Sequence, residues 1–109
     1  MSISRLNQLL AFHESNPEDS FILFALAKEH EKIGDDDKAL FYFEKLVAND
    51  PGYVGVYYHL GKLHEKLGDP ASAFSIYKTG MNVARQAGDQ HSLNELAGAK
   101  LNLGDEEDF

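Results

Sequence analysis

The fold of this chain is decided by KEHEKIGD at residues 28–35, which returns thirty-four residues later as KLHEKLGD at residues 62–69. Six of the eight positions are identical. The same register also relates three apolar pairs outside these stretches: Leu26 and Leu60, Ala39 and Ala73, and Phe43 and Tyr77. A period of this length with helical punctuation is typical of a stacked array of helix hairpins. We therefore expect an all-α fold.

Each period predicts a helix, a tight turn and a second helix. Leu23, Leu26 and His30 lie three and four residues apart, so they share one stripe of a helix that ends at Gly34, where glycine allows a left-handed turn. Asp35 then follows as the N-cap of the next helix, and Asp69-Pro70 repeats this start in the second copy. The chain should thus alternate helices with short Gly-Asp connections.

This pattern resembles the tetratricopeptide repeat (TPR) family over nearly the whole chain. The resemblance is carried by the first-helix residues Leu23, Leu26, Ala27, Tyr57, Leu60 and Gly61, the second-helix residues Ala39, Phe43, Ala73 and Tyr77, and the closing prolines Pro17 and Pro51. It implies a right-handed stack of antiparallel helix hairpins, a TPR-like α-solenoid of about six helices. His30 and His64 stand where the family has a large aromatic residue.

The repeat register also predicts the organisation of the chain. We expect a single TPR-like domain over residues 1–104 and an acidic, frayed tail over 105–109. The domain is divided into a half repeat at 4–17, repeats at 20–51 and 54–87, and a capping helix at 90–102. Helices are expected near 4–15, 20–33, 36–48, 53–67, 70–87 and 90–102. The last of these is polar on its outer side, which suits the end of an array.

Composition limits the function of the 109-residue chain. A formal net charge of −8 opposes binding to nucleic acid or to anionic lipid, and no apolar run approaches the length of a membrane span. The N-terminal residues do not resemble a signal peptide. The sequence has no cysteine, so disulfides and thiol chemistry are excluded. We expect a cytoplasmic protein without a cofactor.

The resemblance places candidate partner-binding residues on the first helix of each repeat, which lines the concave groove of such arrays. These residues are Phe21, Phe24 and Lys28 in one repeat and Tyr58, Lys62 and Glu65 in the next. Aromatic rings supply contact area and lysine supplies a point charge, so the groove should bind a protein or peptide, with an acidic or carboxylate group as the matching feature. In the competing interpretation, Glu31 and Glu65 pair with the lysines and leave a solvated helix face.

Other functions have less support in the sequence. No serine or threonine has the glycine-rich elbow or the His-Asp neighbours that activate a hydroxyl, so we expect no enzyme. His30 and His64 are expected to be satisfied, partly buried side chains rather than metal ligands. The alternative function is a self-associating structural unit, a homodimer formed through the terminal helices or through Phe41.

Overall fold

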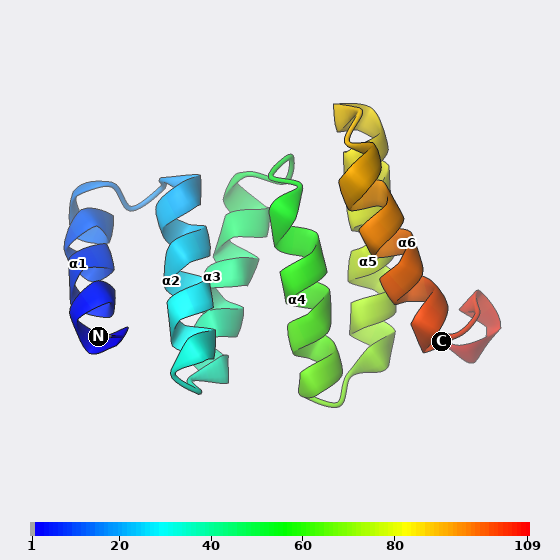
Figure 1. Cartoon of the computed structure of the whole chain (residues 1–109), viewed down its shortest axis with the longest axis horizontal. Coiled ribbons are helices and arrows are strands. Elements are labelled where there is room, and N and C mark those ends of the chain that lie inside the picture. Colours follow the sequence, from blue (N-terminus) through cyan, green and yellow to red (C-terminus); the bar gives the residue numbers. More distant parts are fainter. Residues whose placement is uncertain (1) are drawn as a thin grey trace. The chain divides into compact units, whose positions relative to one another are not determined.

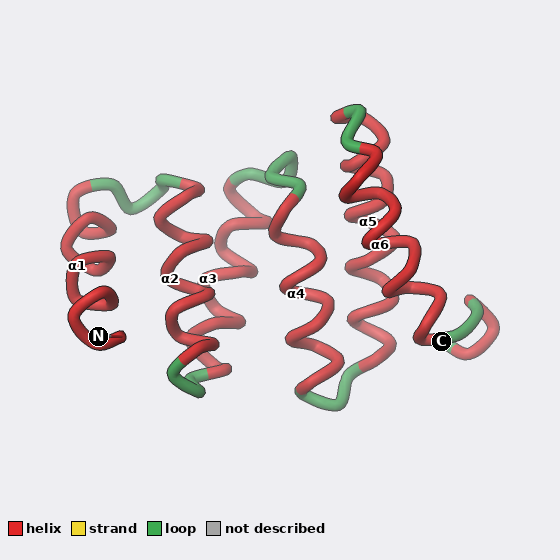
Figure 2. Tube along the Cα trace, viewed as in Figure 1, coloured by secondary structure: helices red, strands yellow, loops and turns green. Residues whose placement is uncertain are grey.

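The structure is a computed structural model that describes residues 2–109, with side chains from Arg5 onward. Met1, the first residue of the predicted domain, lies outside the described residues. Over residues 2–109 the chain forms six α-helices and one short 3₁₀ helix, with no strand (Figures 1 and 2). The all-α prediction and the six predicted helices are therefore confirmed. Within the same residues, no helix combines the length and the apolar character needed to cross a bilayer.

The helices belong to two compact units, which meet in sequence at Tyr53 and Val54. The first unit contains α1 (Ser2–Ser15), α2 (Ser20–Lys32) and α3 (Asp36–Asn49). The second contains α4 (Gly55–Lys66), α5 (Pro70–Ala87), α6 (Gln90–Leu103) and the 3₁₀ helix η1 (Glu106–Asp108). These bounds agree closely with the predicted helix ranges, because the repeated turn residues mark each helix end.

Helices α2, α3, α5 and α6 each have an aspartate as N-cap. The carboxylates of Asp19, Asp35, Asp69 and Asp89 each accept a hydrogen bond from the backbone N–H three residues ahead, at 3.0–3.3 Å. Each bond satisfies one of the amides that the first turn of a helix leaves unpaired. Gly34 and Gly68 occupy the equivalent turn in the two hairpins with φ of 86° and 79°, a conformation that strains residues with a side chain. The predicted Gly-Asp punctuation is thus confirmed.

In the first unit, α2 and α3 form an antiparallel hairpin, and α1 packs against α2 (Figure 1). Leu9 of α1 joins Ala25 and Leu26 of α2 in one apolar cluster. Beside it, the Arg5 Nε atom lies 3.4 Å from the buried carboxylate of Glu29. The N-terminal half repeat is therefore held by apolar contact together with one ion pair.

In the second unit, α4 and α5 form the equivalent hairpin, and α6 packs against α5 and α4. Tyr57, Leu60, Tyr77 and Leu96 are almost completely buried. These residues come from all three helices, so the apolar stripes expected from the sequence meet in one core.

Two expectations from the sequence need correction. His30 is only 3% exposed, and its Nδ1 atom has no hydrogen-bond partner, so it is more deeply buried and less satisfied than expected. The acidic tail does not fray, because Glu106 pairs with Lys78 and Phe109 stacks on Phe74. The sequence interpretation missed this docking because it considered only the four acidic residues of the tail and not Phe109.

Candidate partner-binding site

The three candidate residues of α2 differ in exposure. Phe21 is 65% exposed. Phe24 is half-buried, with its ring centroid 6.1 Å from that of Phe43 and 5.6 Å from that of Tyr53. The Lys28 Nζ atom lies 3.4 Å from the Glu31 carboxylate. On this helix, therefore, one ring is open to solvent, one borders the core, and the lysine makes the predicted intrahelical pair.

The three candidate residues of α4 form a connected series. The Lys62 Nζ atom lies 5.7 Å from the centroid of the Tyr58 ring and 3.7 Å from the Glu65 carboxylate. The first distance allows a cation–π attraction, which acts within about 6 Å. The lysine is thus already held by a ring and by a carboxylate, as the competing interpretation of the sequence predicted for Glu65.

Glu65 is also tied to the core of the second unit. Its carboxylate accepts a hydrogen bond from the hydroxyl of Tyr77, which is fully buried. Burial raises the pKa of Tyr77, and the hydrogen bond to Glu65 raises it further. The hydroxyl therefore stays protonated and continues to donate. Glu65 thus contacts both Lys62 and Tyr77, and its role in binding a partner stays a prediction.

A pocket of about 160 Å³ lies beside Tyr58, between the first turns of α4 and α6. Its lining residues are Val54, Gly55, Tyr58, His59, Ser92, Glu95 and Leu96. Ser92, Glu95 and Leu96 are three and four residues apart and so share one face of α6. The sequence interpretation did not select Ser92 and Glu95, because it treated α6 only as a cap, although this spacing was visible.

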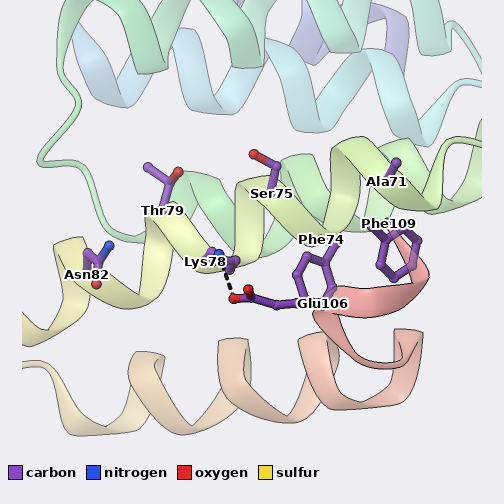
Figure 3. A pocket seen from close by; sticks show the side chains of 8 residues that line it. All are labelled: Ala71, Phe74, Ser75, Lys78, Thr79, Asn82, Glu106 and Phe109. Carbon is purple, nitrogen blue, oxygen red and sulfur yellow. Dashed lines mark ion pairs between the residues drawn. The ribbon is translucent and has the colours of Figure 1, made fainter.

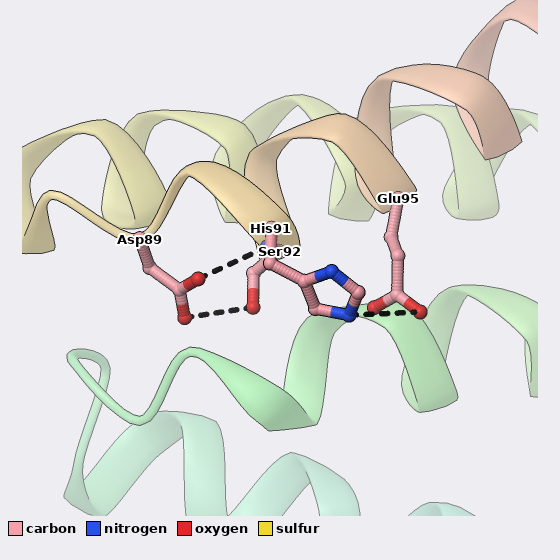
Figure 4. A network of polar contacts seen from close by, with 4 residues as sticks. All are labelled: Asp89, His91, Ser92 and Glu95. Carbon is pink, nitrogen blue, oxygen red and sulfur yellow. Dashed lines mark hydrogen bonds and ion pairs between the residues drawn. The ribbon is translucent and has the colours of Figure 1, made fainter.

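The side chains at the start of α6 are ordered by their own contacts (Figure 4). Asp89 accepts hydrogen bonds from the Ser92 backbone at 3.0 Å and from the Ser92 hydroxyl at 2.8 Å. These bonds lower the pKa of the Asp89 carboxyl. The His91 Nε2 atom, next to Ser92 in sequence, lies 3.9 Å from the carboxylate of Glu95 one turn further on. Ser92 and Glu95, which line the pocket, therefore both have polar partners at the start of α6.

The six candidate residues divide equally between the two units. Phe21, Phe24 and Lys28 lie on α2, whereas Tyr58, Lys62 and Glu65 lie on α4. Each helix combines aromatic rings with a lysine, as predicted. A single concave groove lined by both helices stays a prediction. Over residues 2–109, no three or more His, Asp or Glu side chains gather in a way that could hold a metal ion.

Comparison with known proteins finds both sequence families and solved structures that resemble this chain. Two models of the tetratricopeptide repeat family match residues 20–63 and 54–86. The crystal structure of a tetratricopeptide repeat domain protein from Salinibacter ruber is 49% identical, covering 78% of this chain and 94% of that one, with a TM-score of 0.75. No curated protein gives a significant match.

Two more distant structures share the fold. One is PcrH, solved in complex with the chaperone binding region of PopD, with 14% identity, 94% of this chain and 77% of that chain covered, and a TM-score of 0.86. The other is SycD, a type III secretion translocator chaperone of Yersinia enterocolitica, with 12% identity, 99% and 75% coverage, and a TM-score of 0.86. With the two family models and the close relative from Salinibacter, this chain belongs to the tetratricopeptide repeat family.

Proposed function

We propose that the chain is a non-catalytic protein-interaction module that binds a peptide or protein segment through the candidate faces of α2 and α4. The observation that carries this proposal is the Tyr58–Lys62 pair beside the pocket between α4 and α6. An aromatic ring with two rotatable bonds gives large contact area at low entropic cost. We place this activity in the cytoplasm, with which the lack of cysteine accords.

The size of the pocket favours a peptide over a small molecule. Sites for drug-sized ligands enclose about 300–1,000 Å³. The pocket beside Tyr58 has about 160 Å³, which suits one side chain of a longer segment. PcrH, whose fold this chain shares, was crystallised with a segment of another protein, PopD. Both points support a partner that lies across the surface and inserts single residues.

An acidic group on the partner would have to replace the glutamates that now hold the lysines. Lys28 pairs with Glu31, and Lys62 with Glu65, in both cases three residues apart and with side chains that are partly exposed. Such pairs contribute only about 0.2–0.5 kcal/mol each. A carboxylate arriving with a bound segment can therefore take over either lysine at small cost.

The test compares capture of partners from native lysate by the wild-type chain and by the Tyr58→Ala/Lys62→Ala variant. We expect the variant to lose capture while its circular dichroism stays that of a folded helical protein. The matched control is Phe41→Ala/Glu44→Ala, which removes an exposed ring and a charge from α3 and should leave capture intact. Retained capture by the folded Tyr58/Lys62 variant would refute the assignment of this face.

A second candidate function is homodimerisation. It is favoured by large apolar side chains that remain in water, since Phe12 and Phe41 are each 58% exposed and Leu101 is 73% exposed. These residues lie on α1, α3 and α6, which include the two terminal α-helices named in the alternative. The molar mass in solution separates the two functions.

A further inference from the structure

The last five residues of the chain fold back onto α5. Gly104 has φ of 127°, and a side chain there would meet the Asp108 carboxylate, so glycine permits the reversal after α6. The Asp105 backbone N–H then donates a hydrogen bond of 2.8 Å to Asp108, which closes the short helix η1. We refer to Asp105–Phe109 as the tail.

Two contacts hold the tail on α5 (Figure 3). The Phe109 ring stacks on Phe74, with centroids 4.8 Å apart and planes inclined by 25°. The Glu106 carboxylate lies 2.7 Å from the Lys78 Nζ atom. Lys100 covers Phe74 from α6, with its Nζ atom 4.9 Å from the ring centroid. The tail therefore contacts one aromatic ring, Phe74, and one cation, Lys78.

The surface beneath the tail is basic, although the chain as a whole is acidic. Lys78, Arg85 and Lys100 line one cavity of about 220 Å³ together with Glu106. A neighbouring cavity of about 440 Å³ is lined by Ala71, Phe74, Ser75, Lys78, Thr79, Asn82, Glu106 and Phe109. The tail lines both cavities through Glu106 and the larger one also through Phe109. It thus covers the surface at Phe74 and Lys78 and leaves open space beside it.

The contacts of the tail are weak enough to be replaced. The side chains of Lys78 and Glu106 are 47% and 68% exposed, so water and salt screen their ion pair. Phe109 stays 44% exposed while it stacks on Phe74. Docking also costs the conformational entropy of the tail backbone. A competing segment that supplies a ring and a carboxylate can therefore displace the tail.

We propose that the surface of α5 and α6 around Phe74, Lys78 and Lys100 is a second binding site, which takes an acidic segment of a partner protein carrying an aromatic residue. The tail occupies this site in the free protein and acts as a built-in competitor. The site uses other residues than the Tyr58–Lys62 face and does not depend on the function proposed for that face. Charge complementarity and the seated Phe109 define the chemistry of the ligand.

The test uses the 109-residue chain and a fluorescein-labelled peptide, Gly-Asp-Glu-Glu-Asp-Phe, blocked at its C-terminus. Fluorescence anisotropy is measured with the wild-type chain and with the Phe109→Ala/Glu106→Gln variant, in which the tail is released. If the tail holds the site nine-tenths of the time, the variant should bind the peptide about tenfold more tightly than wild type. Circular dichroism should show unchanged helix content in the variant.

Two controls define the specificity. Adding Lys78→Ala to the released variant should weaken binding, and so should replacing the phenylalanine of the peptide by alanine. Added salt should weaken binding as well, because the charges are exposed. Equal affinity of the wild-type and released chains, or no saturable binding by the released chain, would overturn the proposal. Binding that does not respond to Lys78→Ala would also overturn it.

Discussion

His30 combines deep burial with an incomplete set of contacts. Its ring stacks on Tyr42 with centroids 5.5 Å apart, and its Nδ1 atom lies 3.9 Å from the Asp35 carboxylate, beyond hydrogen-bond distance. Burial lowers the pKa of His30 below its usual value of 6.5. The charges of Asp35 and Glu29 oppose this shift, whereas that of Lys38 adds to it. The imidazole of His30 is therefore neutral at pH 7 in the folded first unit.

This lowered pKa predicts a loss of stability in acid. Below about pH 6.5 the unfolded chain protonates His30 while the folded chain does not, so the unfolded state gains stability as the pH falls toward the folded-state pKa. Above that pH the contribution of His30 is constant. We expect the free energy of unfolding, measured by urea denaturation, to fall from about pH 7 to about pH 5.5, and to fall less in a His30→Phe variant.

His91 supplies the control, because its side chain is 86% exposed. A His91→Gln variant should keep the pH dependence of the wild-type chain. Equal pH dependence in the His30→Phe variant and the wild type would show that other groups cause the effect.

At the residue scale, the sequence correctly predicted side chains whose contacts lie within a few residues of the same chain segment. Asp35 and Asp69 could be assigned as N-caps because a cap needs only its own next three residues. The hydrogen bond from Tyr77 to Glu65 was not foreseen, since it joins two helices and depends on their packing. For the same reason the full burial of His30 was not predicted.

The hairpin of α4 and α5 is held at close range by two glycines. A Cβ atom at Gly61 would lie 2.1 Å from the Tyr77 ring, and one at Gly80 would lie 2.5 Å from the Cβ of Tyr57. Each helix thus inserts a tyrosine where the other has no side chain. This exchange sets the separation of the two helices, because neither position has room for a methyl group.

The same geometry predicts opposite effects for two glycine-to-alanine changes. Gly80→Ala should lower the free energy of unfolding by about 1–3 kcal/mol, since the new methyl group would push α5 away from α4. Gly98 lies within α6, and a Cβ atom there would meet nothing within 4 Å. Gly98→Ala should therefore stabilise the chain by about 0.5–1 kcal/mol through helix propensity.

Urea denaturation followed by far-ultraviolet circular dichroism measures both changes. Gly98→Ala also serves as the control for the general effect of alanine in a helix. A Gly80→Ala variant as stable as the wild type would mean that the helices do not approach as closely as described.

At the element scale, the helices could be predicted because the repeat supplies two independent copies of the same pattern. The 3₁₀ helix and the docked tail have no second copy. Four consecutive acidic residues at 105–108 suggested a tail that lies in solvent. Phe109 is the one residue of the tail that indicates packing against the protein. The α6 wall of the pocket was missed because Leu96 follows Leu60 by 36 residues instead of the 34 of the repeat, so α6 was treated only as a cap.

At the scale of the whole molecule, its large charge weighs against self-association. The formal net charge is −8, and copies of like charge repel each other. A stable interface buries about 800 Å² on each partner, whereas one aromatic side chain supplies about 150–250 Å². Phe41 alone, at 58% exposure, falls well short of that area.

We therefore expect a monomer of 12.1 kDa at micromolar concentration, measured by light scattering after size exclusion. A molar mass twice as large would favour the homodimer function instead. In that case, two variants would locate the interface. Recovery of the monomer by Phe41→Ser would place it on α3, and recovery by Leu101→Ser would place it on α6. An unchanged monomer mass in wild type and both variants would leave the exposed apolar side chains as isolated features of the surface, which are common in soluble proteins.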